Sequence, residues 1–445
     1  MIIGNNFKPA FYLFIFSLFF LKSYSQDRID AAEIETKTLE FYTNKNWNSL
    51  IAIGNEALKQ GIDIYLLRYR IGISYFEKSN YEAAISNLER AKEFDSNDPV
   101  LMEYLYYSYI YTNRNEKAVE LLTIFPDDLK AKVNYKSPLF KSISAEIGVL
   151  STDNFDTNKN ANLKGTNNYA QGTFYSDVVF GNIVINNQIS PNFKLQNLFS
   201  LVTNTSNDLF QSSLPIERTQ VFTNKNNYFQ WNVIGSYYYK GWNIGVGFGL
   251  YDSSFITYSP PPPLQPNAPF SSIKTNASNF SSSFSLSKKL SFIEPVLAIT
   301  YSNLSDINSL SIEGSLNYFP LGNLNFYGNT KIGIVTNELQ TNTIFTQLLG
   351  FKISKKIWIE GYGAYGNHQN YISDAGLYVF NTPNKINWYA GSNLNFYFNQ
   401  FDFSIGYGIQ ERASSYENGL NPSTTNTKNY TYNYNLLKTK IVWKF

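Results

Sequence analysis

The sequence predicts an α + β protein with two domains: an N-terminal helical stack and a transmembrane antiparallel β-barrel of about 14 strands (12–16). The division follows from two periodicities, a 34-residue repeat within residues 26–132 and a period-two alternation of apolar and polar side chains within residues 133–445. The third observation is the last strand, which ends the chain on Phe445. We expect a signal peptide at residues 1–25 to precede both domains.

The composition supports a barrel. The 445 residues include 35 Tyr, 35 Phe, one His and no Cys, and only 16% are charged. The mean hydropathy is negative, which argues against a helical membrane protein but suits a barrel whose polar and apolar residues alternate. The net charge of +2 gives no support for nucleic-acid binding. The absence of Cys excludes disulfides, Cys-ligated zinc and thiol chemistry.

The first 25 residues have the pattern of a secretory signal peptide. Lys8 supplies a positive charge, and residues 9–21 form an apolar run that is too short for a comfortable helical span. Ser23 and Ser25 place small residues just before an expected cleavage at Gln26. An uncleaved membrane anchor is the less favoured alternative. The mature protein is not expected to be a lipoprotein, because no Cys follows.

Residues 26–132 repeat apolar and small side chains with a period of 34. This pattern resembles the tetratricopeptide repeat (TPR), in which small residues let two antiparallel helices approach and aromatic residues fill the gap. About three repeats fit between Ala31 and Lys130. The domain is expected in the periplasm, either as a docking surface for an unidentified protein or as a structural spacer. The positions that should pack between helices are Phe41, Trp47, Ala57, Gly72, Tyr75, Tyr81, Ala84, Ala91, Tyr109 and Ala118.

From about residue 134 the helical spacing stops and strand-like alternation begins. From Trp242 to Leu250, for example, apolar residues alternate with Asn and Gly. Short turns alternate with longer polar loops, which is typical of outer-membrane barrels with short periplasmic turns. Two soluble β-sandwiches are the alternative, but they would leave the signal peptide and the terminal Phe unexplained. The longer loops are expected at residues 153–168, 205–226, 259–276, 368–385 and 412–429.

Successive side chains of a strand point to opposite faces, and this alternation predicts a lumen wall that carries both positive and negative charges. The candidate lumen residues are Asp177, Glu313, Lys331, Glu360, Asp402, Lys438 and Lys440. Their opposed charges should bond across the interior, and an open lumen of this kind would be weakly ion-selective. Tyr side chains of inward parity leave open a path for sugars, although packing against neighbouring strands is the preferred interpretation. These residues are Tyr175, Tyr238, Tyr327 and Tyr397.

The last strand carries an apolar face of Ile441, Trp443 and Phe445 that alternates with Lys residues. This pattern resembles the C-terminal insertion signal of bacterial outer-membrane proteins. The resemblance implies the barrel-assembly machinery and outer-membrane lipid as partners, and the cell outer membrane as the location.

No catalytic, cofactor or metal site is predicted. His368, the only His, is expected at the surface of an Asn-rich external loop, although some outer-membrane lipases use Ser, His and Asn. It has no second His or suitably spaced carboxylates with which to bind a metal. Residues 260–263 are four consecutive Pro, which predict a stiff polyproline II segment.

Helical repeats followed by a barrel resemble, in architecture only, surface lipoprotein assembly modifiers, YaiO-like barrels and exopolysaccharide exporters. The resemblance covers nearly the whole mature chain and implies transport, secretion or surface assembly of a client, with the repeats as a protein-docking platform. A non-conducting structural or adhesive protein anchored to periplasmic partners is the alternative. A membrane-embedded hydrolase is disfavoured, because no nucleophile–base pair is evident. No functional residue is transferred, because the barrel has no family-specific motif.

Overall fold

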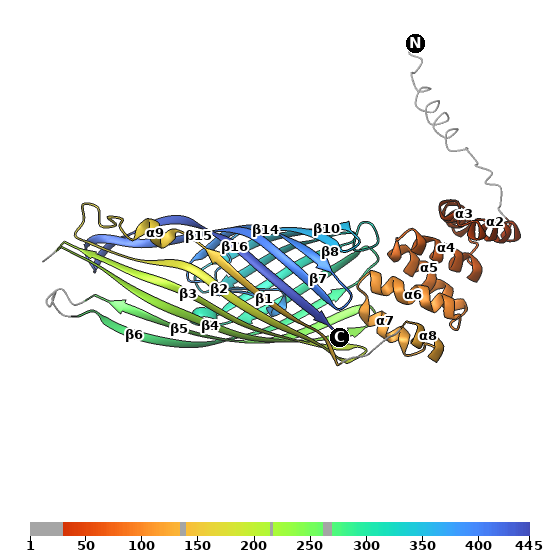
Figure 1. Ribbon diagram of the computed structural model, residues 1–445, viewed down its shortest axis with the longest axis horizontal. Coiled ribbons are helices and arrows are strands. Elements are labelled where there is room, and N and C mark those ends of the chain that lie inside the picture. Colours follow the sequence, from red (N-terminus) through yellow and green to blue (C-terminus); the bar gives the residue numbers. More distant parts are fainter. Residues whose placement is uncertain (1–29, 134–138, 214–216, 261–268) are drawn as a thin grey trace, which may run out of the picture.

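The computed structural model describes residues 30–133, 139–213, 217–260 and 269–445. The expected signal peptide and residues 261–263 of the Pro run lie outside the described residues. Figure 1 shows an elongated molecule in which a stack of helices lies at one end of a long barrel. The C-terminus lies at this same end, which we call the helical end; the opposite end is called the distal end.

The N-terminal helices begin at regular intervals. Two series begin at residues 31, 65 and 99 and at residues 47, 81 and 115, so each series repeats every 34 residues. Asp or Asn side chains cap four of these helices by accepting a hydrogen bond from a first-turn amide. The helices are α2 (Ala31–Thr43), α3 (Trp47–Lys59), α4 (Tyr65–Glu77), α5 (Tyr81–Phe94), α6 (Pro99–Tyr111), α7 (Asn115–Leu122) and α8 (Asp127–Lys132).

The helices pack through an apolar core. Leu50, Leu88 and Leu105 are completely buried. A Cβ at Gly72 would lie 2.7 Å from the Leu88 side chain, so any larger residue there would force Leu88 to shift. Most of the expected small and aromatic packing positions are buried, namely Ala57, Gly72, Ala84, Ala91, Tyr109 and Ala118, while Phe41, Trp47, Tyr75 and Tyr81 are half-buried.

The second domain is a closed antiparallel barrel of 14 strands, the number predicted. The first and last strands pair, with Ile143 opposite Trp443, so that no sheet edge is left. The barrel strands are β1 (Phe140–Ser151), β2 (Tyr169–Ser190), β3 (Phe193–Ser212), β4 (Arg218–Tyr239), β5 (Trp242–Ser259), β6 (Ser271–Lys288), β7 (Ile293–Ser302), β8 (Ser309–Tyr318), β9 (Phe326–Asn337), β10 (Thr341–Ser354), β11 (Ile357–Tyr365), β14 (Lys385–Tyr397), β15 (Phe401–Asn421) and β16 (Thr424–Lys444).

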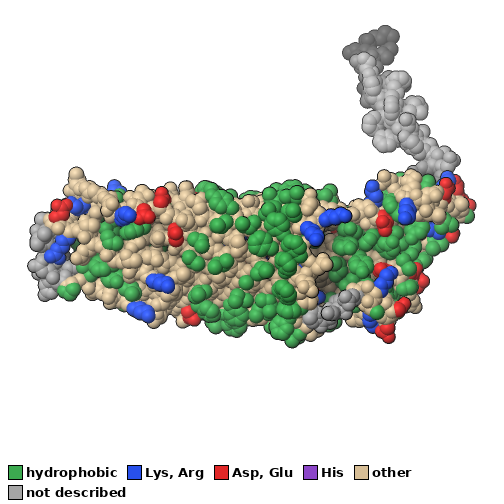
Figure 2. Space-filling view, in the orientation of Figure 1, with side chains coloured by type: hydrophobic (Ala, Val, Ile, Leu, Met, Phe, Trp, Pro, Cys, Tyr) green, Lys and Arg blue, Asp and Glu red, His purple; other side chains and the backbone are tan. Residues whose placement is uncertain are grey.

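The outer surface of the barrel is apolar over the half nearest the helices. Figure 2 shows hydrophobic side chains gathered there, whereas the distal part is mostly polar and carries scattered charges. Ile147, Val246 and Leu437 are typical, each with more than half of its surface exposed. Polar residues of the opposite parity, such as Asn232, are buried inside. This distribution is the inverse of a water-soluble core and matches a lipid-facing belt.

No helix within the described ranges is long and apolar enough to cross a bilayer.

Two of the predicted external loops are largely strand. β3 and β4 extend through much of residues 205–226, and β15 and β16 are joined by only two residues within 412–429. In the predicted loop at residues 259–276, β6 already begins at Ser271. The Asn-, Ser- and Thr-rich composition misled the prediction. Backbone hydrogen bonds between paired strands do not require apolar side chains, and β3 to β6 and β15 therefore project beyond the belt (Figure 1).

Candidate functional site in the barrel lumen

The segment between β11 and β14 folds into the barrel and not outward. It contains the short strands β12 (Tyr371–Ser373) and β13 (Tyr378–Phe380), which pair with each other. We call residues 366–384 the lumen hairpin. Tyr371 and Ile372 are almost fully buried, and Ile372 packs against Tyr251 of β5. The prediction of an external loop at residues 368–385 was therefore wrong, because its polar residues bond to the barrel wall and not to outside water.

Two of the predicted lumen residues hold the tip of this hairpin. Glu313 of β8 accepts hydrogen bonds from the Tyr371 hydroxyl, from Ser373 Oγ at 2.8 Å and from the Asp374 amide at 2.8 Å. Lys331 of β9 donates to Ser373 Oγ at 2.7 Å and to Asp374 Oδ1 at 2.5 Å. The Lys331 ammonium lies 3.8 Å from Glu313. All three charged groups therefore meet in one network, in which Glu313 and Lys331 are buried and Asp374 is partly exposed.

The hairpin also contacts a second part of the wall. Ser283 of β6 donates a hydrogen bond to the Ala375 carbonyl at 2.7 Å. A Cβ at Gly247 of β5 would lie 2.8 Å from that same carbonyl oxygen, so a glycine is required for the approach. Asp374 and Ala375 both have a φ of 54°, a strained conformation for residues with a side chain. The hairpin thus leaves the wall at β11 and β14, contacts β8 and β9, and reaches β5 and β6.

His368 is buried within the base of this hairpin. Its ring lies 5.1 Å from the Phe380 ring and 5.2 Å from the Tyr389 ring, measured between centroids. Nδ1 lies 2.7 Å from the Gly366 carbonyl, which requires a proton on this nitrogen. The expectation of a surface His was wrong, because the loop that carries it turns inward. Its contacts are those of a packing residue.

The other predicted lumen residues form separate contacts. Glu360 accepts a hydrogen bond from the Tyr327 hydroxyl at 2.6 Å, Asp402 pairs with Lys444 at 2.6 Å, and Lys438 lies 3.7 Å from Glu146. Lys440 is half-buried on the same face of β16 as Lys438.

The alternation of inward and outward side chains predicted Asp177 in the lumen, and this prediction is wrong. This residue is exposed at a β-bulge between Tyr175 and Val178 and accepts a hydrogen bond from the Thr152 amide at 2.9 Å. A bulge shifts the inside–outside alternation by one residue, and it cannot be located by counting. Glu146 and the buried Arg412, which lies over the Tyr434 ring, were missed by the sequence prediction. Arg412 falls in a segment expected to be a loop.

Two residues of the expected insertion signal, Ile441 and Trp443, lie on the outer face of β16, and Phe445 directly follows this strand. Ile441, Trp443 and Phe445 are each about half exposed. Ile441 pairs with Ala145 of β1 and Phe403 of β15, so this strand lies between two others in the closed ring.

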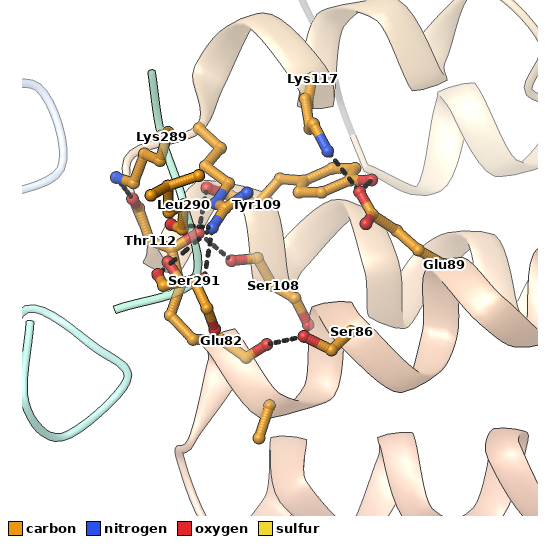
Figure 3. Close-up of polar contacts among 12 residues, drawn as sticks. Glu82, Ser86, Glu89, Ser108, Tyr109, Thr112, Lys117, Lys289, Leu290 and Ser291 are labelled. Atoms are coloured by element: carbon orange, nitrogen blue, oxygen red, sulfur yellow. Dashed lines mark hydrogen bonds and ion pairs between the residues drawn. The ribbon is translucent and has the colours of Figure 1, made fainter. Parts of the chain in front are cut away.

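The helical domain is docked on the turns at the helical end of the barrel. Figure 3 shows Lys289 and the backbone of Leu290 and Ser291, from the turn after β6, beside α5 and α6. The Arg114 guanidinium pairs with Glu82 and donates to the Leu290 carbonyl at 3.1 Å. Lys289 Nζ donates to the Thr112 carbonyl at 2.7 Å. Two domains are thus joined by charged side chains that bond to backbone carbonyls.

The turn after β8 contributes further bonds to this junction. The Glu82 amide donates to the Gly322 carbonyl at 3.0 Å, and Asn323 Nδ2 donates to the Ser79 carbonyl at 2.7 Å. Burial raises the pKa of the Glu82 carboxyl, although the nearby Arg114 acts in the opposite direction. Burial lowers the pKa of Lys289. Both groups are therefore removed from water by the contact between the domains.

Within the described residues, no group of three or more His, Asp or Glu side chains converges to hold a metal ion.

No family model and no curated protein matches the chain. Solved barrels are similar to it at low identity. The toluene transporter TodX of Pseudomonas putida has a TM-score of 0.45 at 9% identity, covering 69% of this chain and 91% of that one. A Pseudomonas aeruginosa FadL homologue has a TM-score of 0.42 at 9% identity, covering 68% and 90%. A bacterial polysaccharide outer membrane secretin has a TM-score of 0.34 at 8% identity, covering 69% and 99%. No functional assignment follows from likeness at this level.

Proposed function

We propose that the protein is an outer-membrane transport channel, in which the lumen hairpin is the constriction and the helical domain is a periplasmic platform for a protein that supplies or receives the client. The apolar belt supports placement in a membrane. Barrel strands alone can span a bilayer, because their backbone groups pair with one another in the closed sheet.

One observation carries the transport role: the network of Glu313, Lys331 and Asp374 that holds the hairpin tip. The strained tip at Asp374 and Ala375 is kept in place by few side chains. A hairpin held in this way is suited to narrow the lumen and to shift when a client passes. Charged rings and constrictions are also the features by which barrels select what passes.

The docking role rests on the 34-residue spacing of the helix starts, which is typical of tetratricopeptide repeats. The junction holds the helical domain beside the barrel mouth, so that a bound partner would be delivered there. No catalytic role is proposed, since His368 packs against aromatic rings and carbonyls and no nucleophile of the described segments bonds to it.

Single-channel recording in planar bilayers tests the transport role. We expect small or brief openings from the wild-type protein and larger, steady conductance when residues 370–382 are replaced by a short Gly-Ser linker. Glu313→Gln and Lys331→Met should give intermediate behaviour, because each removes only part of the network. A control variant shortened at the distal β15–β16 turn, which lies far from the hairpin tip, should conduct like the wild type.

The alternative is a non-conducting scaffold or adhesin, and the same hairpin favours it by obstructing the lumen. If the hairpin-deleted barrel is folded and remains electrically silent, the transport proposal is wrong and the scaffold is preferred. Folding is verified by the shift in gel mobility between unheated and boiled samples.

A further inference from the structure

Two contiguous cavities lie between the distal part of the barrel wall and the second arm of the lumen hairpin. Their volumes are about 330 Å³ and 520 Å³. Both are lined by β2, β3 and β5, and both include Pro383 of the hairpin. Together we call them the distal vestibule. Each has the size of a typical small-ligand site. The residues that line both cavities are Thr173, Tyr175, Asp208, Thr257 and Pro383.

The vestibule wall is rich in hydrogen-bonding groups that carry no charge. Asn226, Ser206 and Ser253 line one cavity, and Asn384 and Ser414 line the other. Such groups can each donate and accept hydrogen bonds.

Two tyrosine rings and one carboxylate complete the wall. Tyr175 and Tyr228 are half-buried and line the vestibule, and within the described part of the chain neither hydroxyl makes a hydrogen bond to the protein. Asp208 is held in place by the Thr173 hydroxyl, at 2.7 Å, and by Asn224 Nδ2, at 2.9 Å. Each carboxylate oxygen retains a lone pair for a ligand.

This lining discriminates between ligand classes. A hydrocarbon or fatty-acid chain would leave the Tyr175 and Tyr228 hydroxyls without partners, which costs about 1–3 kcal/mol for each buried group. The Asn226 and Asn384 amides already donate to neighbouring side chains. An anion would meet the carboxylates of Asp208, Asp306 and Glu417. Among the described residues that line the two cavities, the only cation is Lys385. A neutral polyhydroxylated ligand avoids both penalties. Its hydroxyls match the wall, and its C–H faces can stack on the negatively charged faces of aromatic rings.

We propose that the distal vestibule binds a neutral oligosaccharide, with Tyr175 and Tyr228 as stacking platforms and Asp208 as the acceptor for neighbouring sugar hydroxyls. This inference rests on the proposed transport function and specifies its substrate class. It places the first sugar contacts on the far side of the hairpin from the helical domain.

Equilibrium binding tests the inference without requiring conductance. The full-length protein in lipid nanodiscs is titrated with maltohexaose, cellohexaose and chitohexaose, and binding is followed by saturation-transfer difference NMR and calorimetry. We expect at least one hexasaccharide to bind. Tyr175→Ala combined with Tyr228→Ala should weaken that binding about tenfold or more, in line with the loss of two stacking contacts. The double variant Tyr175→Phe and Tyr228→Phe should retain most of the hexasaccharide binding. Tyr237→Ala, on the outer face, is the matched control.

Three outcomes would overturn the proposal. The first is that none of the three hexasaccharides binds to folded protein. The second is that a hexasaccharide binds equally well to the double alanine variant, which would put the site elsewhere. The third is that laurate or a cationic peptide binds in the vestibule while the sugars do not. Sugar binding by an electrically silent barrel would sustain the site and refute transport, whereas conductance without sugar binding would refute the site alone.

Discussion

The helical domain buries its apolar side chains, whereas the barrel carries many of its apolar side chains on its outer surface. In the helical domain Leu50 and Leu88 are inside, and most charged side chains face water, with Arg70, Glu82 and Arg114 as buried exceptions. In the barrel Ile147 and Val246 are outside, while Asn226 and Asn232 are buried. The chain therefore contains one domain whose outer surface suits water and one whose outer surface suits lipid. The difference shows that burial alone does not identify a core; the surrounding solvent must be known as well.

The first prediction concerns the junction between the two domains, where the largest effect is expected. Arg114→Met leaves the Glu82 carboxylate buried without its partner, which typically costs about 3–5 kcal/mol. The stability of the docked helical domain should fall accordingly. The measurement is the thermal loss of helical circular dichroism in the intact protein. Arg90→Met is the control, since it removes exposed ion pairs with Asp63 and Glu93. If both variants melt alike, the junction is not energetically important.

The second prediction compares equivalent surface positions in the two solvents. Val246 and Leu39 are both exposed apolar residues, one on the barrel belt and one on α2. Val246→Arg should destabilise the barrel by about 2–4 kcal/mol, because the charge enters lipid. Leu39→Arg should change the stability of the helical domain by no more than about 0.5 kcal/mol. Urea unfolding of the protein in lipid vesicles, followed by tryptophan fluorescence and circular dichroism, measures both. Equal effects would contradict the lipid-facing assignment of the belt.

The smallest effect is expected from pH, and only in the helical domain. Hydrogen bonds from Arg68 and Arg90 lower the pKa of Asp63, although burial opposes them. A carboxyl with a lowered pKa stabilises the folded state above its unfolded pKa of about 3.9, and this contribution is lost as the pH falls through the lower folded value. Helical melting temperatures should therefore decrease below about pH 4. Asp63→Asn should flatten this decrease, and an unchanged slope would show that Asp63 does not contribute.

Sequence periodicity was sufficient for the strand count and for the regular helix starts, because both depend on local side-chain spacing. The alternation of side chains along the strands also predicted that Glu313 and Lys331, which lie on adjacent strands, face the lumen. It could not show that they bind Ser373 and Asp374, since these residues come from a separate segment about 40 to 60 positions away.

The inward fold of the lumen hairpin was not predictable from composition. An Asn-rich loop has the same residue types whether it bonds to water or to a polar lumen wall. The strands beyond the belt were missed for a similar reason, because backbone pairing is compatible with Asn, Ser and Thr side chains when water is outside. At Asp177 a single bulge was enough to reverse the expected orientation.

One face of each barrel strand should meet lipid and the other should meet water. The chain contains no Cys, so single cysteines can be placed at residues 437 to 441 of β16 and spin-labelled in lipid vesicles. Electron paramagnetic resonance then measures the collision of each label with oxygen, which is enriched in lipid, and with a water-soluble nickel complex. We predict that labels at 437, 439 and 441 favour oxygen and labels at 438 and 440 favour nickel. Equal accessibility at all five positions would contradict the account.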